Sequence, residues 1–530
     1  MTDSTHRSRP HPQVINKWMV LASVVFGVFM VILDSTVVNV AFRTLQEEFN
    51  AGVNHSQWII SIYIMALGIS TPLSGFLGDR FGMKRIFLIG LAIFVIGSFL
   101  CGLAPNLNSL IAARALQGFG GGIALPLGTA YLFSAFPPEE QGKALGIFGI
   151  ALVMAPAMGP LLGGWLVDAN LWRWIFFINV PIGAVGVAMG RRFLHEIVQD
   201  PHQKLDFWGL ITSTIGFGSV LYAASIAADQ GWTSTHVVTF FAIGAVALLI
   251  FVFVELKVAE KPLLDLRLFK STIFTNAAIV GWVAVVALFA AEFLMPLYLQ
   301  VLRGYSAFES GLILLPLAIA SGIVLPLAGQ LYDRVGPRPL VTLGFILLAI
   351  NTWQFSQLKI DTPLPWIMAL LALRGVALGL TVQTTLVAAL GSVPPPKYSR
   401  GSALINATRQ VVQSIAVAAL ATVLATAITP GLSDQLQQFQ SQIPAQMMES
   451  TEGGQLALCD IPDATPALPA VASNAITQFC GDYIQGLERA YHYTLIAALL
   501  ALATGILLPG WPREWAGHRR RRQQPSAVTH

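Results

Sequence analysis

Residues 75–84 read Gly-Phe-Leu-Gly-Asp-Arg-Phe-Gly-Met-Lys, and residues 329–338 read Gly-Gln-Leu-Tyr-Asp-Arg-Val-Gly-Pro-Arg. Both segments place a Gly, an Asp, an Arg, a second Gly and a basic residue at the same spacing, and Gly75 and Gly329, like every matching pair, are 254 residues apart. Long apolar stretches flank each copy. The repeat predicts two homologous halves, and the apolar flanks predict membrane bundles, an arrangement found among secondary transporters.

The composition favours a membrane protein over a soluble one. Of the 530 residues, 55% are hydrophobic and only 11% are charged, which leaves too little polar surface to cover a soluble globule. We expect an all-α membrane protein with two pseudo-symmetric six-helix bundles and two extra helices, fourteen transmembrane helices in total. The predicted spans are 17–42, 55–78, 85–104, 108–134, 140–166, 172–193, 207–228, 237–257, 272–302, 306–331, 338–357, 364–392, 399–428 and 487–510.

These spans divide the chain into five parts. A cytoplasmic tail, 1–16, precedes a six-helix bundle, 17–193, and a linker with two extra helices, 194–271. A second six-helix bundle, 272–510, contains an extracytoplasmic loop, 429–486, and a basic cytoplasmic tail, 511–530, ends the chain.

The basic residues predict the orientation of the helices. With a cytoplasmic N-terminus, 23 of the 31 Lys and Arg residues fall on the inner side, as the positive-inside rule requires. Both termini of this multi-pass protein are therefore expected on the cytoplasmic side of the cell membrane. The basic residues behind the net charge of +4 are spread over eight short segments rather than gathered on one face, so the charge reflects membrane orientation and not nucleic-acid binding.

Several kinds of chemistry have no support in the sequence. No phosphate-binding loop of the G-x-x-x-x-G-K-[ST] type occurs, and the nine His and three Cys residues lack metal-ligand spacing. We therefore expect no enzyme activity, no metal and no cofactor, with transport driven by a gradient. The glycine run 118–122 lies in an apolar helix and follows no strand, so close helix packing is expected there rather than a dinucleotide loop.

Two cysteines, Cys459 and Cys480, lie in the predicted outer loop, which contains acidic residues and no Lys or Arg. An oxidising exterior would allow a disulfide between them. Two unpaired thiols fit the spacing equally well, so the sequence leaves both alternatives open.

Five charged residues interrupt the apolar helices: Asp34, Arg114, Glu292, Arg374 and Arg409. A charge at the middle of a membrane helix costs roughly 2.5 to 3.5 kcal/mol on insertion scales, so each needs a partner or a watery cavity. Asp34 and Arg114 fall at matching depth, as do Glu292 and Arg374, in helices related by the repeat. We therefore predict two pseudo-symmetric pairs, Asp34 with Arg114 and Glu292 with Arg374.

Such a pair suggests a proton switch. Desolvation raises the pKa of a carboxyl group and a nearby guanidinium lowers it, so a modest change in water access can move a proton on or off. Asp34 is the proposed proton carrier, Arg114 its modulator and Glu292 a second acid. Static ion pairs that hold the bundle together are the alternative, and Arg409 is expected to brace the inner gate.

These residues resemble the fourteen-helix drug:proton antiporter branch of the major facilitator superfamily. Residues 33–41, Leu-Asp-Ser-Thr-Val-Val-Asn-Val-Ala, are similar to the helix-1 signature of that branch, and the closing Leu-Pro is replaced by Phe-Arg. Segment 75–85 resembles the loop motif thought to form a cytoplasmic latch, with Met83 at a position that is usually basic. The resemblance implies gating roles for Asp79 and Arg80, and for Asp333 and Arg334 in the second copy.

Two further segments carry the resemblance. Arg114 with Gln117 and the following glycines is similar to the helix-4 motif whose arginine is implicated in proton movement. Residues 155–164 resemble the helix-5 antiporter motif, with Ala155 in place of its first glycine. Its prolines remove helix hydrogen bonds and its glycines thin the helix, so a bend is expected there. The motif residues are Pro156, Gly159, Pro160, Gly163 and Gly164.

The resemblance implies a proton-coupled exporter that works by alternating access. Expected partners are a small lipophilic, cationic substrate, protons and membrane lipids, with no nucleic acid; the chain is expected to act as a monomer, and a periplasmic adaptor stays open. Export of a lipid or an endogenous metabolite is the alternative, and a membrane sensor or scaffold without transport is a further one.

Overall fold

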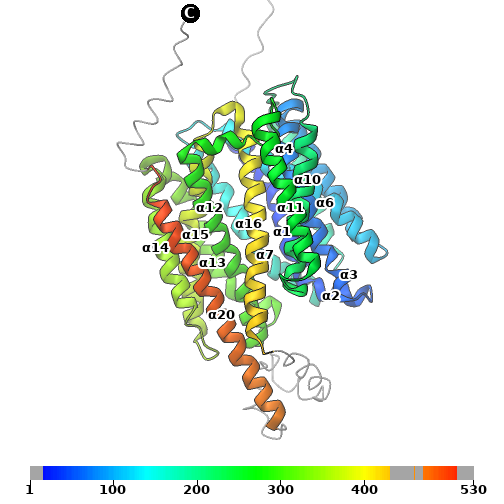
Figure 1. Ribbon diagram of the computed structural model, residues 1–530, viewed down its shortest axis with the longest axis vertical. Helices are drawn as coiled ribbons and strands as arrows, with labels where there is room; N and C mark the ends of the chain where they lie inside the picture. The colour runs from blue at the N-terminus through cyan, green and yellow to red at the C-terminus, as the bar shows by residue number, and fades with distance from the viewer. Residues whose placement is uncertain (1–15, 430–458, 460–469, 510–530) are drawn as a thin grey trace, which may run out of the picture.

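The computed structural model describes residues 16–429, 459 and 470–509. Helices fill most of these ranges and no β-strand occurs within them. Figure 1 shows the long helices side by side in one bundle, most of them running from one end of the bundle to the other.

The first half contains the first six predicted spans. Short helices α2 (Phe42–Glu48) and α3 (Val53–Ser56) connect the first two of them. The spans correspond to α1 (Lys17–Val40), α4 (Trp58–Phe81), α5 (Met83–Gly102), α6 (Leu107–Ala135), α7 (Gln141–Asp168), and α8 (Trp174–Phe177) with α9 (Asn179–Phe193).

The two extra helices, α10 (Phe207–Gln230) and α11 (Thr235–Phe253), follow and end in the π-helical η1 (Val254–Val258) and the 3₁₀ turn η2 (Leu266–Lys270). The second half has the same order of long helices as the first. It consists of α12 (Thr272–Leu297) with the π-helical η3 (Tyr298–Leu302), α13 (Ala307–Val335), α14 (Pro337–Phe355), α15 (Leu364–Gly391), η4 (Pro395–Lys397) with α16 (Tyr398–Ala427), and α20 (Ala470–Gly505).

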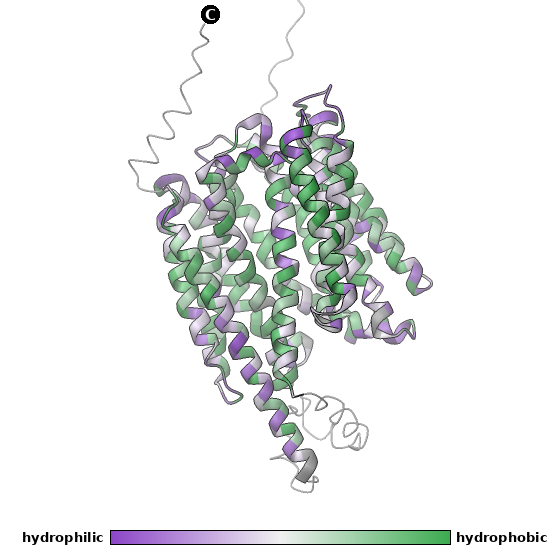
Figure 2. Cartoon of the chain, in the orientation of Figure 1, coloured by the Kyte–Doolittle hydropathy of each residue, from purple (hydrophilic) through white to green (hydrophobic). Residues whose placement is uncertain are grey.

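Twelve helices in the described ranges are long and apolar enough to cross a membrane. The other two predicted spans are helical as α14 and α20, so the predicted total of fourteen is compatible with the structure. Apolar residues run along the middle of the helices and polar ones gather toward their ends (Figure 2). Large apolar side chains are exposed on many of these helices, so the prediction of an all-α membrane protein is confirmed.

The last helix differs from its predicted extent. α20 begins at Ala470, although the apolar stretch alone placed its start near residue 487 and assigned the preceding residues to the outer loop. Ile476, Phe479 and Tyr483 recur at helical spacing and are buried in an apolar cluster with Leu424 of α16. The packing of this buried stripe stabilises the part of α20 that precedes the apolar stretch.

The first and last described residues of the chain lie on the same side of the bundle. Lys17, which begins α1, forms an ion pair with Glu140 before α7, and Arg338 at the start of α14 donates a hydrogen bond to the carbonyl of Leu508 after α20. We call this end, marked by Lys17 and Arg338, the basic end. The even number of helices explains why the chain returns to it.

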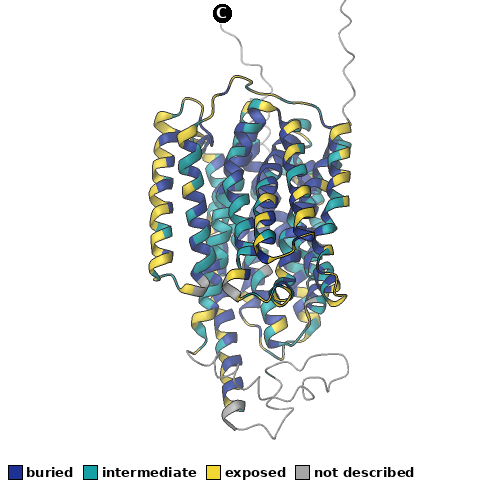
Figure 3. Ribbon diagram, turned by 90° about the vertical axis from the view of Figure 1, so that its right-hand side faces the viewer, coloured by how far each residue is buried: buried dark blue, intermediate teal, exposed yellow. Residues whose placement is uncertain are grey.

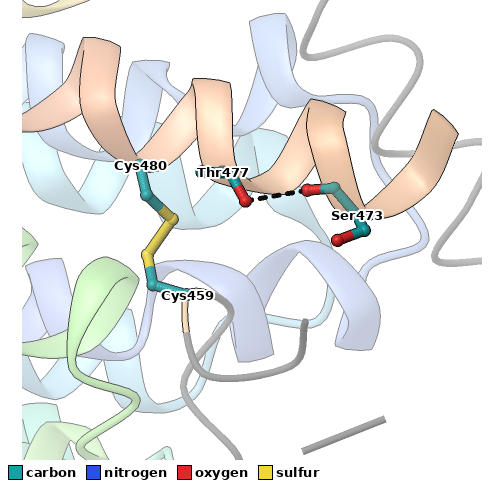
Figure 4. The surroundings of a disulfide bond; sticks show 4 residues. All are labelled: Cys459, Ser473, Thr477 and Cys480. Atoms are coloured by element: carbon teal, nitrogen blue, oxygen red, sulfur yellow. Dashed lines mark hydrogen bonds between the residues drawn. A yellow bond between two sulfur atoms is a disulfide. The ribbon is translucent and has the colours of Figure 1, made fainter. Parts of the chain in front are cut away.

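The opposite end of the bundle contains a disulfide bond. The structure joins Cys459 to Cys480 near the start of α20, with a Cα–Cα distance of 6.0 Å (Figure 4). The carboxylate of Asp482, one residue beyond Gly481, accepts hydrogen bonds from the backbone N–H and the hydroxyl of Thr429. These contacts tie the beginning of α20 to the segment that leaves α16.

Glycines set the close approach of helices in the first half, where buried residues line the interior (Figure 3). A Cβ atom on Gly118 of α6 would lie 2.4 Å from the carbonyl oxygen of Tyr63 in α4. A Cβ on Gly120 would lie 2.5 Å from the backbone nitrogen of Phe94 in α5. The expected packing role of the run 118–122 is therefore confirmed at these two positions.

We expect the substitution Gly118→Ala to lower the stability of the folded protein by about 1 to 3 kcal/mol, because the new methyl group must push the backbone of α4 away. A thermal-unfolding assay of the purified protein measures this effect. Gly322→Ala in α13 is the matched control, since a Cβ there meets nothing within 4 Å. Equal destabilisation by both changes would contradict the packing argument.

Candidate functional site

The predicted pair in the first half exists. Asp34 of α1 and Arg114 of α6 form an ion pair through Oδ2 and Nη1, and both side chains are at most 1% exposed. The second donor group of the arginine, Nε, donates a hydrogen bond to the carbonyl of Ile59 in α4 at 3.1 Å. The guanidinium carbon also lies 4.0 Å from the centre of the Tyr63 ring. Arg114 thus keeps neutral partners that do not depend on Asp34.

Two amides complete the surroundings of the carboxylate. Gln117 of α6 and Asn179 of α9 each donate a hydrogen bond to Asp34 Oδ1, at 2.7 and 2.8 Å. Both amide nitrogens also lie 3.1 Å from the hydroxyl of Ser98 in α5, and Ser98 donates to the carbonyl of Phe176. Four helices, α1, α5, α6 and α9, therefore meet at one buried polar cluster, which we call the Asp34 cluster: Asp34, Ser98, Arg114, Gln117 and Asn179.

The second half places a similar arginine in a different setting. Arg374 of α15 is fully buried and donates to Asn351 and Thr352 of α14 and to the carbonyl of Ala287 in α12. Its guanidinium carbon lies 5.4 Å from the centre of the Phe355 ring. Glu292 belongs to α12, but its side chain is outside the described residues. The predicted pair of Glu292 with Arg374 therefore stays a prediction.

Arg409 lies eleven residues after the start of α16, about 16 Å along the helix axis. Its Nη2 donates to the hydroxyl of Thr385 in α15 at 3.4 Å. It also lies close to α12, because a Cβ on Gly281 would be 3.0 Å from Nη2. This residue therefore joins three helices of the second half, and its expected role at the inner gate stays a prediction.

The helix that contains the antiporter-like motif lies between the two halves. α7 runs as one α-helix through Pro156 and Pro160. A Cβ on Gly159 would lie 2.3 Å from Thr36 Oγ1 of α1, and one on Gly163 would lie 3.1 Å from the carbonyl of Val37. On another face, a Cβ on Gly164 would lie 3.3 Å from the backbone nitrogen of Phe308 in α13. The small residues thus let α7 approach helices of both halves.

The first copy of the repeated motif makes contact across the halves. Asp79, fully buried at the end of α4, accepts hydrogen bonds from the Ser399 hydroxyl and from Arg400 Nε, the latter at 2.8 Å. Both partners lie in the first turn of α16, where a negative charge is also favoured by the helix dipole. The backbone N–H groups of Gln199 and Asp200 in the linker donate to the Asp79 carbonyl.

The second copy makes the reciprocal contact. The carboxylate of Asp333, at the end of α13, accepts hydrogen bonds from the backbone N–H groups of Gly142 and Lys143, both at 3.0 Å. These groups belong to the first turn of α7. Each half therefore supplies an aspartate that binds the N-terminus of a helix in the other half. We call the Asp79–α16 and Asp333–α7 contacts the two cross-half caps.

The arginines beside these aspartates play a smaller part in the contacts. Arg80 stacks on Phe76 and Phe81, with its guanidinium carbon 5.8 and 5.1 Å from the ring centres. Arg334 is exposed. The linker adds a further ion pair, Lys261 with Asp200, and this hydrogen bond lowers the pKa of the Asp200 carboxyl group. The predicted gating residues thus divide into two aspartates that contact the other half, Asp79 buried and Asp333 half-buried, and two peripheral arginines.

Residues 24–417 match the family model of the Major Facilitator Superfamily. The chain belongs to the Major Facilitator Superfamily. The human organic anion transporter MFSD10 has a similar fold, with a TM-score of 0.57, 13% identity and coverage of 91% of this chain and 99% of that one. The predictions of the family and of a transporter rather than an enzyme are therefore confirmed.

Three relatives within this superfamily carry functional names. The multidrug resistance protein B homolog of Mycobacterium tuberculosis is 31% identical over 94% of this chain and 90% of its own length. The lincomycin resistance protein LmrB of Listeria innocua is 30% identical over 83% and 93%. The riboflavin transporter RibZ of Clostridioides difficile is 31% identical over 82% and 93%. These superfamily members differ in the cargo that their names state.

Sequence reasoning missed four contacting residues. Ser98 and Asn179 are small polar residues within apolar spans, and Ser399 and Arg400 follow a proline-rich turn. Asn179 lies 81 residues from Ser98 and 145 from Asp34, and Ser399 and Arg400 lie 320 and 321 residues from Asp79, so no local pattern relates these pairs. The one available signal was the presence of polar side chains in otherwise apolar helices, which marks Ser98 and Asn179 as needing partners.

Proposed function

We propose that this superfamily member is a proton-coupled secondary exporter of lipophilic, cationic drugs or other amphiphilic small molecules, which works by alternating access. The observation that carries the proposal is the Asp34 cluster, a fully buried acid held by one guanidinium and two amides. An ionisable group in a membrane bundle is expensive to bury and is by default functional.

The two cross-half caps support alternating access. They close the bundle at the basic end through two buried or half-buried aspartates and two helix N-termini. Such contacts can form in one state and separate in another without unfolding either half. The caps therefore give the rocking of the two halves a defined closed state.

The orientation follows from the charge distribution and the disulfide. We infer that the basic end is cytoplasmic in the cell membrane, because the predicted inner segments hold most of the Lys and Arg residues. The Cys459–Cys480 disulfide lies at the opposite end, which suits an oxidising exterior. The charge distribution and the disulfide both support our proposal that the two termini are cytoplasmic.

The cargo class rests on the relatives and on the acids. Two relatives are named for drug or lincomycin resistance, and a buried carboxylate at the site suits a cation. A relative named as a riboflavin transporter favours export of an endogenous metabolite as the second candidate. Both candidates share the same driving force.

The test uses the purified full-length protein in liposomes. A pH gradient, acidic on the side of the disulfide-bearing end, should drive accumulation of a fluorescent lipophilic cation, and an uncoupler should abolish it. A panel that includes ethidium, lincomycin and riboflavin ranks the cargo classes. Absence of any substrate-dependent proton flux across the panel would overturn the proposal.

A further inference from the structure

Asn179 occupies a defined place in the Asp34 cluster. It is the first residue of α9, directly after the turn at Ile178 that separates α8 from α9, and its side chain is fully buried. Its Nδ2 donates to Asp34 Oδ1 at 2.8 Å and to Ser98 Oγ at 3.1 Å. Its Oδ1 is buried and has no hydrogen-bond partner among the described residues. A buried carbonyl oxygen without a partner is unusual and needs an explanation.

The hydrogen bonds around Asp34 suit only its ionised form. Oδ2 accepts from Arg114, and Oδ1 accepts from Gln117 and Asn179. All three partners are donors. Protonated Asp34 would carry an O–H group, which requires an acceptor instead. Gln117 Oε1 already accepts from Arg114 at 2.7 Å, so Asn179 Oδ1 is the acceptor that remains in the cluster.

We propose that Asn179 is a positioning residue that matches the Asp34 cluster to either protonation state of the acid. In the ionised state, Nδ2 donates to the carboxylate, as in the structure. In the protonated state, a half-turn of the amide presents Oδ1 to the new O–H group. Proton uptake then leaves no buried O–H group without an acceptor, which lowers the penalty of the neutral state.

This inference rests on the proposed role of Asp34 as proton carrier and adds a residue to it. The other titratable or charged groups around Asp34 are Arg114 from α6, Tyr63 from α4 and Cys101 from α5. The facing α7 contributes Gly159, and α9 contributes the neutral amide. Asn179 is therefore an uncharged side chain that can both donate to Asp34 and accept from it.

On acidification, the infrared amide carbonyl stretch of Asn179 in the purified protein should shift to lower frequency, because its oxygen gains the hydrogen bond of the Asp34 O–H group. The band is assigned to Asn179 by its absence in Asn179→Leu. The shift should be absent in Asp34→Asn, which has no acid to protonate at this position, and an amide that only donates to the carboxylate would gain no such bond. This signal reports protonation even if the protein moves no cargo.

Two variants keep the test decisive. Thr71→Val removes a buried hydroxyl that bonds only to the carbonyls of Leu67 and Gly122, so it controls for a lost polar contact elsewhere in the same half. Asn179→Ser, which also lacks the amide group, assigns the band if Asn179→Leu does not fold. An Asn179 amide band that stays in place when the folded parent protein is acidified would overturn the inference, while failure of transport alone would overturn only the proposed function.

Discussion

Asp34→Asn is expected to reduce pH-gradient-driven accumulation of cargo in liposomes to the background of protein-free vesicles. The amide is close in shape to the protonated acid but cannot release a proton, so coupling is lost while the cluster keeps its packing. Arg114 retains the Ile59 carbonyl, Gln117 and the Tyr63 ring as partners. The protein should therefore still insert and elute as a single species, and it should still exchange cargo down its own gradient.

The control is Asp168→Asn, the same chemical change at an exposed aspartate that ends α7. It should leave the accumulation rate unchanged. Undiminished gradient-driven accumulation by Asp34→Asn would mean that the acid is a structural ion pair, and the proton would then have to be carried elsewhere.

Asp79→Asn is expected to open the basic end. The change weakens the Asp79–Arg400 ion pair, in which the aspartate side chain is buried and the arginine side chain is 12% exposed, so the contact loses a charge-assisted hydrogen bond. The closed state alone contains the contact, so the population shifts toward states in which the halves are apart. Spin labels on cysteines introduced at the exposed Arg192 and Arg334 report the distance between the halves by pulsed electron paramagnetic resonance.

The expected result is a longer mean label distance than in the labelled parent protein. Asp333→Asn should have a similar effect, since it weakens the reciprocal cap at α7. Glu48→Gln serves as the control, because its weak pair with Arg173 lies within the first half and is partly exposed. Identical distance distributions in Asp79→Asn and the parent would show that the cap does not hold the halves together.

The sequence predicted the fold because its information is carried by long apolar stretches and a repeated motif. The 254-residue offset indicated the two halves, and the matched depths of Asp34 and Arg114 predicted their ion pair. The predicted start of α20 is later than the observed one, because an apolar stretch shows which part of a helix contacts lipid and not where the helix begins.

The contact partners of the predicted residues could not be predicted from the sequence. Asp79 was recognised in its motif, but nothing local to residue 79 indicates Ser399 and Arg400, which approach it only when the two halves meet. Asn179 was missed because a single asparagine at a helix start resembles an ordinary capping residue. Its role becomes apparent only when the hydrogen-bond donors and acceptors of five side chains from four helices are considered together.

Neither half is self-sufficient at the basic end. Asp79 accepts hydrogen bonds from two side chains in the first turn of α16, and Asp333 accepts them from two backbone N–H groups in the first turn of α7. A chain cut within the linker would give two fragments, each with a bare helix start and a carboxylate that has lost its donors. Recombination of such fragments would restore both contacts at once, which makes the junction a built-in means of mutual recognition.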